Sequence, residues 1–138
     1  MISALDLPAV RRGALLCLLV ATPAAVISAL LADNESGTDQ SNWVYVALLA
    51  IVAAYLAGGA VAGKAARESP FANGAAAAFM AFAVVQIIGI VIRLARGDDV
   101  SLIALAFNSL LAASIGAVGA GFGVRRGTLD TGGGEPTG

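Results

Sequence analysis

The stretch WVYVALLAIVAAYLAGGAVAGKAAR, residues 43–67, decides the fold class predicted for this chain. It begins with the aromatic residues Trp43 and Tyr45, continues without a charge, becomes rich in glycine and alanine, and ends with Lys64 and Arg67. A helix needs about 20 apolar residues to cross a hydrocarbon core of about 30 Å, and aromatic and basic residues are typical of the two membrane interfaces. The stretch therefore predicts a transmembrane helix.

Three further segments of the chain have the same length and character. The predicted spans are residues 13–32, 43–63, 71–92 and 100–124, and every charged residue lies outside them. The composition agrees, with 59% hydrophobic residues, 12% charged residues and a mean hydropathy of +0.88. Four such runs leave too little polar surface for a soluble helical domain. We therefore expect an all-α fold, a four-helix transmembrane bundle that occupies residues 13–126.

The distribution of basic residues predicts how this bundle is oriented. Six lie on the side of the two termini and two on the opposite side: Arg11, Arg12, Lys64, Arg67, Arg125 and Arg126 against Arg93 and Arg96. Lys and Arg are enriched in cytoplasmic loops. The sequence therefore predicts a multi-pass protein of the cell (inner or plasma) membrane, with a cytoplasmic N-terminal segment, residues 1–12, and a flexible cytoplasmic tail, residues 127–138.

Several residues mark the expected helix ends. Asp6 offers a capping oxygen and Pro8 a preset backbone angle for the first helix, and Ser69 and Pro70 do the same for the third. Pro23 lies in the middle of the first span and should kink it.

A cleaved signal peptide is the alternative for the first span, because it too has a basic front and an apolar run. The run is longer than the usual signal core of about 7 to 15 residues. Leu16 also stands before Cys17 where a lipoprotein cleavage box needs a small residue. We expect this span to remain in the protein.

The composition argues against several classes of function. The chain has one cysteine and no histidine, so it lacks a cysteine pair for a disulfide or a Cys/His cluster for zinc. The net charge of −1 and the absence of a basic block offer no footprint for nucleic acid. The predicted spans hold no Asp, Glu, Lys or Arg, which are the usual marks of proton-coupled transport and of hydrolysis. We therefore expect no enzymatic activity, no cofactor and no catalytic or metal-binding residue.

Glycines in the second and fourth spans allow a nucleotide-binding and a packing interpretation. Gly58 and the Gly63-Lys64 pair have the spacing of a phosphate-binding loop, but Ala65 replaces the required Ser or Thr and no strand precedes them. Small residues four positions apart instead let membrane helices approach closely. The predicted packing positions are Gly59, Gly63, Ala112, Gly116, Gly119 and Gly123.

Polar side chains inside the predicted spans are few, and the main candidates are Asn73, Gln86, Asn108 and Ser114. Gln86 and Asn108 should lie at the same depth on neighbouring antiparallel helices, which predicts an interhelical hydrogen bond between the two amides. The alternative is that the two amides face different neighbours or another subunit.

The segment LAGGAVAGKAARESPFANGAAAAFM, residues 56–80, resembles small four-span membrane proteins of bacteria, including actinobacteria. In those proteins a glycine-rich second span, a short basic loop and a proline- and glycine-containing start of the third span recur. The resemblance covers roughly residues 10 to 126 and implies a four-span fold without an assigned activity.

These observations predict a non-enzymatic structural or interaction component of the membrane. Its expected partners are the lipid bilayer and either a second copy of itself or another membrane protein. The alternative is a subunit of an oligomeric channel or transporter for a small solute, in which the four polar residues line an uncharged path.

Overall fold

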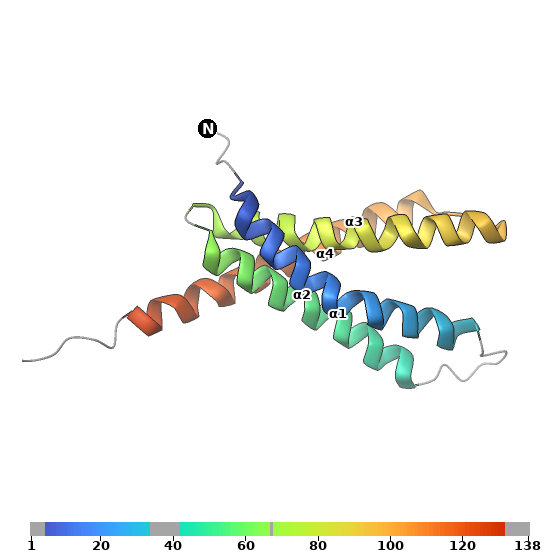
Figure 1. The fold of residues 1–138 in the computed structure, drawn as a ribbon, viewed down its shortest axis with the longest axis horizontal. Helices are drawn as coiled ribbons and strands as arrows, with labels where there is room; N and C mark the ends of the chain where they lie inside the picture. Colours follow the sequence, from blue (N-terminus) through green and yellow to red (C-terminus); the bar gives the residue numbers. More distant parts are fainter. Residues whose placement is uncertain (1–4, 34–41, 67, 132–138) are drawn as a thin grey trace, which may run out of the picture.

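A computed structural model describes residues 5–33, 42–66 and 68–131, and all four regular elements in this part of the chain are helices (Figure 1). They are α1 (Leu7–Asp33), α2 (Asn42–Ala65), α3 (Pro70–Arg96) and α4 (Leu102–Thr131). Each contains a segment long and apolar enough to cross a membrane: Leu7–Ile27, Tyr45–Ala65, Pro70–Arg96 and Leu102–Arg126. The prediction of an all-α chain with four such helices is confirmed.

The start of α1 follows the predicted capping pattern. The backbone N–H of Ala9 donates to Oδ1 of Asp6 at 3.2 Å, so Asp6 satisfies one of the amides that a helix start leaves without a partner. Pro8 lies in the first turn, where its missing N–H costs nothing.

The start of α3 differs from the prediction. Ser69 precedes Pro70 as expected, but its side chain makes no capping hydrogen bond, because its backbone is left-handed, with φ 52° and ψ 56°. A left-handed residue other than glycine is uncommon and strained. The far end of α3 is conventional, since Gly97 has φ 79° and its N–H bonds to the carbonyls of the last turn.

The helices extend beyond the predicted spans. α1 begins six residues before residue 13, α3 continues to Arg96, and α4 continues through residues 127–131, which we expected to belong to a flexible tail. Hydropathy marks only the part of a helix that fits into hydrocarbon, whereas the backbone hydrogen bonds continue into the interface, where arginine side chains can reach water. The rest of that tail and most of the first loop lie outside the described residues.

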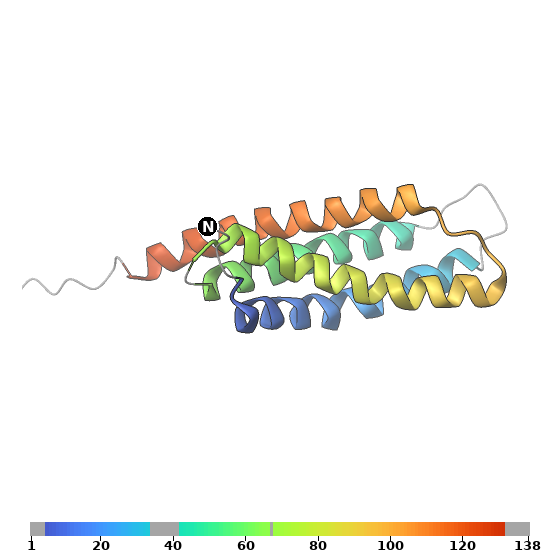
Figure 2. The same ribbon diagram turned by 90° about the horizontal axis from the view of Figure 1, so that it is seen from above.

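The four helices form two antiparallel hairpins, the first made of α1 and α2 and the second of α3 and α4. Between the hairpins, α1 contacts α3, α2 contacts α3, and α2 contacts α4 in the same chain direction. The hairpins cross in the half where α1 and α3 begin and separate toward the other half in the view of Figure 1, whereas Figure 2 shows from above that all four helices run along one long axis. We call these the packed half and the open half.

Candidate functional site

Two glycines of α2 bring the backbone of this helix into direct contact with α4 in the packed half. A Cβ atom at Gly59 would lie 2.8 Å from the Cα of Gly116, and one at Gly63 would lie 2.7 Å from the Cα of Ala120. Real Cβ atoms essentially never come within 3.0 Å of another heavy atom in this way. The two backbones therefore touch without room for a methyl group, as small residues at four-residue spacing allow.

The same arrangement is repeated with the roles of the two helices exchanged. A Cβ at Gly119 of α4 would lie 2.9 Å from the carbonyl carbon of Leu56, and one at Gly123 would lie 2.9 Å from that of Ala60. Each helix thus contributes a GxxxG pair that lies against the backbone of the other. Ala112, the remaining packing position from the sequence, is 2% exposed and belongs to the buried cluster described below.

Four residues that the sequence argument did not select complete these contacts. A Cβ at Gly58 would lie 2.6 Å from the carbonyl oxygen of Gly13, and one at Gly74 would lie 2.6 Å from the Cβ of Ala120. Cys17 is fully buried and its thiol donates to the carbonyl of Ala54, with 3.3 Å between sulfur and oxygen. A search for any two small residues four positions apart, rather than for glycine pairs, would have selected them.

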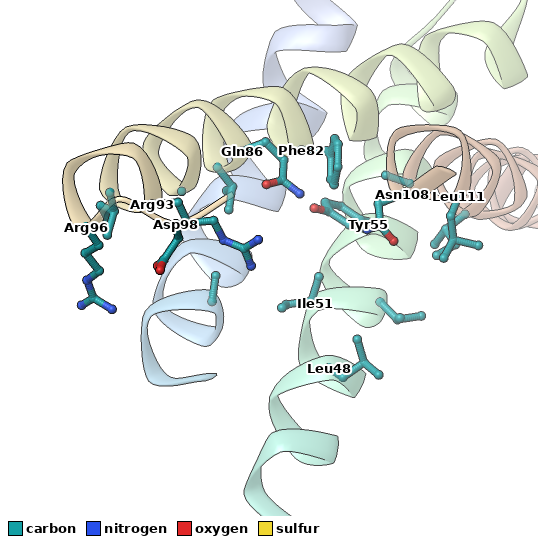
Figure 3. A pocket seen from close by; sticks show the side chains of 17 residues that line it. Leu48, Ile51, Tyr55, Phe82, Gln86, Arg93, Arg96, Asp98, Asn108 and Leu111 are labelled. Atoms are coloured by element: carbon teal, nitrogen blue, oxygen red, sulfur yellow. The ribbon is translucent and has the colours of Figure 1, made fainter. Parts of the chain in front are cut away.

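A cavity of about 740 Å³ lies between the hairpins in the open half (Figure 3). Helix α1 contributes one lining residue and the other three helices contribute several each. The lining residues are Ala25, Leu48, Ile51, Val52, Tyr55, Phe82, Val85, Gln86, Gly89, Ile92, Arg93, Arg96, Asp98, Asn108, Leu111, Ala112 and Ile115. Most of them are apolar, so the walls are suited to an apolar ligand group.

The floor of the cavity is formed by side chains of the buried core. Tyr55 is 6% exposed, Phe82 8% and Ala112 2%, and all three belong to one cluster with Cys17. The remaining buried members of that cluster are Ala21, Ala54, Ala78 and Ala81. The cavity is therefore closed toward the packed half.

The mouth of the cavity is charged. Arg93 and Arg96, from the last turns of α3, and Asp98, from the loop that follows, lie at this end (Figure 3). Below the mouth, the described lining residues include no carboxylate and no amine. This arrangement can hold an apolar group in the interior and a charged or polar group at the mouth, whereas it provides no acid and base pair for catalysis.

The hydrogen bond predicted between the amides of Gln86 and Asn108 is wrong. Gln86 and Asn108 both line the cavity, and among the described residues no hydrogen bond joins them (Figure 3). Counting residues from the loop predicts how deep a side chain lies, but not the direction in which it points. That direction depends on the rotation of the helix about its axis, and here both amides point into the cavity instead of bonding to each other.

The other two polar candidates lie elsewhere. Ser114 is exposed, and its hydroxyl donates to the carbonyl of Leu110 in its own helix, at 2.8 Å. Asn73 is fully buried in the first turn of α3. The four residues therefore line no common path within one chain.

The side chain of Asn73 makes hydrogen bonds to three backbone groups. Its Oδ1 accepts a hydrogen bond from the backbone N–H of Asp6 at 2.8 Å, and its Nδ2 donates to the carbonyls of Glu68 at 3.1 Å and of Ser69 at 3.0 Å. The amide thus joins the start of α1 to the strained connection before α3. Its role in the structure is to hold the packed half together.

Comparison of the chain with protein-family models, with curated proteins and with solved structures finds no match.

Proposed function

We propose that this protein is a non-enzymatic, multi-pass component of the cell membrane that holds another molecule of the membrane between its two hairpins. The observation that carries the proposal is the cavity of about 740 Å³, which is lined by all four helices, closed at its floor and open at its mouth. Its volume is within the range of about 300–1,000 Å³ that is typical of ligand pockets. The glycine contacts of the packed half support this role because they fix the two hairpins at one end while they diverge at the other.

The proposed orientation puts both termini in the cytoplasm and the mouth of the cavity on the outer side. Arg93 and Arg96 are the two basic residues of the open half, whereas the basic residues near the termini and the α2–α3 connection are more numerous. This is the bias that the positive-inside rule associates with cytoplasmic termini.

Filling the cavity provides the test. A Cβ at Gly89 would have only Oε1 of Gln86 nearby, at 3.7 Å, so Gly89→Leu adds a side chain to the cavity without a backbone clash. Ala53→Leu, on an exposed position of α2 that does not line the cavity, is the matched control.

Each protein is extracted from its membrane in a mild detergent and its mass is measured by native mass spectrometry. We expect a retained molecule on the wild-type and Ala53→Leu proteins and its loss from Gly89→Leu. A wild-type protein without any retained molecule, or equal retention by Gly89→Leu, would refute the proposal.

A second candidate function is a subunit of an oligomeric channel or transporter for a small solute. The observation that favours it is the position of Gln86 and Asn108, which line the same cavity. In the double variant Cys17→Ser and Gln86→Cys, the new cysteine should then react with small water-soluble thiol reagents in intact membranes. The reaction should slow when the transported solute is added. An unreactive cysteine at this position would exclude a water-filled path through the cavity.

A further inference from the structure

We propose that the ligand of this cavity is an uncharged lipid that carries carbonyl groups on an apolar body, as a quinone does, and that Tyr55, Gln86 and Asn108 bind these carbonyls. This inference rests on the proposed function, because it names the class of molecule that the cavity would hold. It follows from the hydrogen-bonding groups that face the cavity, from their depth in the membrane and from the side chains around them.

Three polar side chains from three helices face the apolar interior of the cavity. They are Tyr55 of α2, Gln86 of α3 and Asn108 of α4 (Figure 3). In the part of the chain that the structure describes, none of the three makes a hydrogen bond. Tyr55 is 6% exposed, and no fully buried oxygen or nitrogen of a described side chain lacks a hydrogen-bond partner. The hydroxyl of Tyr55 is therefore accessible from the cavity, and all three side chains are available to a ligand.

The shared property of these three side chains is that each can donate a hydrogen bond. The tyrosine hydroxyl donates one, and the amide groups of glutamine and asparagine donate two each. A purely apolar ligand would leave these donors without partners, which is costly in an apolar environment. A carbonyl oxygen accepts two hydrogen bonds, so a ring with two carbonyls can accept one from each of the three side chains.

The depth of the three side chains argues against a phospholipid as their partner. Gln86 lies seven residues before Arg93 in α3, which is about 10 Å at about 1.5 Å per residue. Asn108 lies six residues after Leu102, where the membrane segment of α4 begins, which is about 9 Å. A phospholipid whose charged head group stays in the interface has only its acyl chain at that depth. The partner must therefore carry its polar groups on a body that can enter the hydrocarbon core.

The surroundings of these side chains favour a polar group without a charge. Between the floor and the mouth of the cavity, the described lining residues include no Asp, Glu, Lys or Arg. An ionised group in an apolar site without an opposite charge is strongly disfavoured. A carbonyl accepts the hydrogen bonds of the three donors without bringing a charge into the cavity.

Water is the alternative partner for the two amides. Gln86 and Asn108 also border a smaller cavity of about 140 Å³ between α3 and α4, nearer the loop that joins these helices. The large cavity, however, is lined mostly by apolar side chains. Such a cavity suits an apolar molecule with a few polar groups better than it suits water.

The test compares two molecules of similar shape that differ in their carbonyls. Decyltrimethylbenzoquinone has two ring carbonyls, and decyltrimethylbenzene has the same substituents on a hydrocarbon ring. Each compound is radiolabelled and equilibrated with the purified protein in mild detergent, and the bound amount is measured with protein-free micelles as the background. We expect the quinone to bind at least about tenfold more tightly than the hydrocarbon, since each hydrogen bond should contribute about three- to tenfold.

Three variants assign this difference to the proposed side chains. Tyr55→Phe, Gln86→Met and Asn108→Leu each remove hydrogen-bonding groups and keep much of the side chain's size. Each should weaken binding of the quinone by about three- to tenfold and leave binding of the hydrocarbon unchanged. Ser114→Ala is the matched control, because it removes a hydroxyl of α4 that does not line the cavity. It should bind the quinone as tightly as the wild type does.

The outcomes separate this inference from the proposed function. If both compounds bind equally and Gly89→Leu releases both, the cavity holds apolar molecules without using the three donors, so this inference is wrong and the proposed function stands. If Gly89→Leu still binds the quinone as tightly as the wild type, the quinone is bound at another site and this inference is wrong.

Two further outcomes would also overturn the assignment. If neither compound binds, but the wild-type protein retains a phospholipid or a partner protein that Gly89→Leu releases, this inference is refuted and the proposed function stands. If the wild-type protein binds neither compound and retains no molecule at all, the proposed function is refuted as well.

Discussion

The contact between Gly59 and α4 predicts that a single added methyl group destabilises the protein. In Gly59→Ala, the new Cβ would lie 2.8 Å from both the Cα and the carbonyl carbon of Gly116. Both atoms belong to the backbone and cannot rotate away, so α4 must move as a unit. We therefore expect Gly59→Ala to lose stability, although alanine is the better helix former.

The size of this loss follows from two opposing terms. Overpacking of a tight contact lowers the free energy of unfolding by about 1–3 kcal/mol. Replacing glycine by alanine within a helix raises it by about 0.5–1 kcal/mol. Because the contact is with backbone, the cost should be in the upper part of its range. The expected net loss is about 1–2 kcal/mol, which lowers the unfolding midpoint by about 4 °C or more.

The single cysteine of the chain supplies the assay. Cys17 is fully buried and its thiol lies against Ala54 and Gly58 of α2, so a fluorogenic thiol reagent should react with it only after the helices separate. The midpoint of this reaction is measured during heating of the detergent-solubilised protein.

Gly89→Ala is the matched control, because a Cβ at Gly89 meets only Oε1 of Gln86, at the ordinary distance of 3.7 Å. It should leave the midpoint unchanged or raise it by an amount that corresponds to at most about 1 kcal/mol. Equal midpoints for Gly59→Ala and Gly89→Ala would refute the packing argument, as would a Gly59→Ala protein as stable as the wild type.

Three further predictions concern the polar residues and the orientation. Asn73→Leu should lower stability by about 1–3 kcal/mol in the same thermal assay, since it removes the three hydrogen bonds of a fully buried amide that join Asp6 to Glu68 and Ser69; an unchanged midpoint would contradict this. In a double-mutant cycle, Gln86→Leu and Asn108→Leu should have additive effects, with a coupling below about 0.5 kcal/mol, and a larger coupling would mean that the two amides bond to each other. A reporter that is active only outside the cytoplasm should be silent when fused after residue 138 and active when inserted at residue 37, and the reverse pattern would overturn the proposed orientation.

The four helices could be predicted because membrane helices have an unmistakable composition, whereas their exact ends could not. Charged residues such as Arg93 end a hydrophobic run without ending a helix, so α3 continues past the predicted span to Arg96. The cap of α1 at Asp6 was predicted correctly because capping depends on neighbouring residues alone. The left-handed backbone of Ser69 could not be predicted, since it is held by Asn73, four residues further along.

The cavity could not be predicted because lipid-facing and cavity-facing positions use the same residue types. Leu48 lines the cavity and its neighbour Leu49 does not, and no feature of the sequence distinguishes them. In a soluble protein, the polar face of each helix would have indicated which side is buried. The glycines were more informative, because a close approach of two backbones requires a missing side chain whatever the solvent.

Because α2 and α4 are in direct backbone contact at their glycines and the two hairpins diverge toward the open half, a small rotation about these contacts produces a larger displacement at the mouth of the cavity. In a bilayer, we expect the two leaflets to act unequally on such a bundle. The leaflet around the packed half would meet helices whose backbones are already in contact and that resist compression. Lateral pressure in the other leaflet would act on the diverging part of the hairpins and change the width of the mouth.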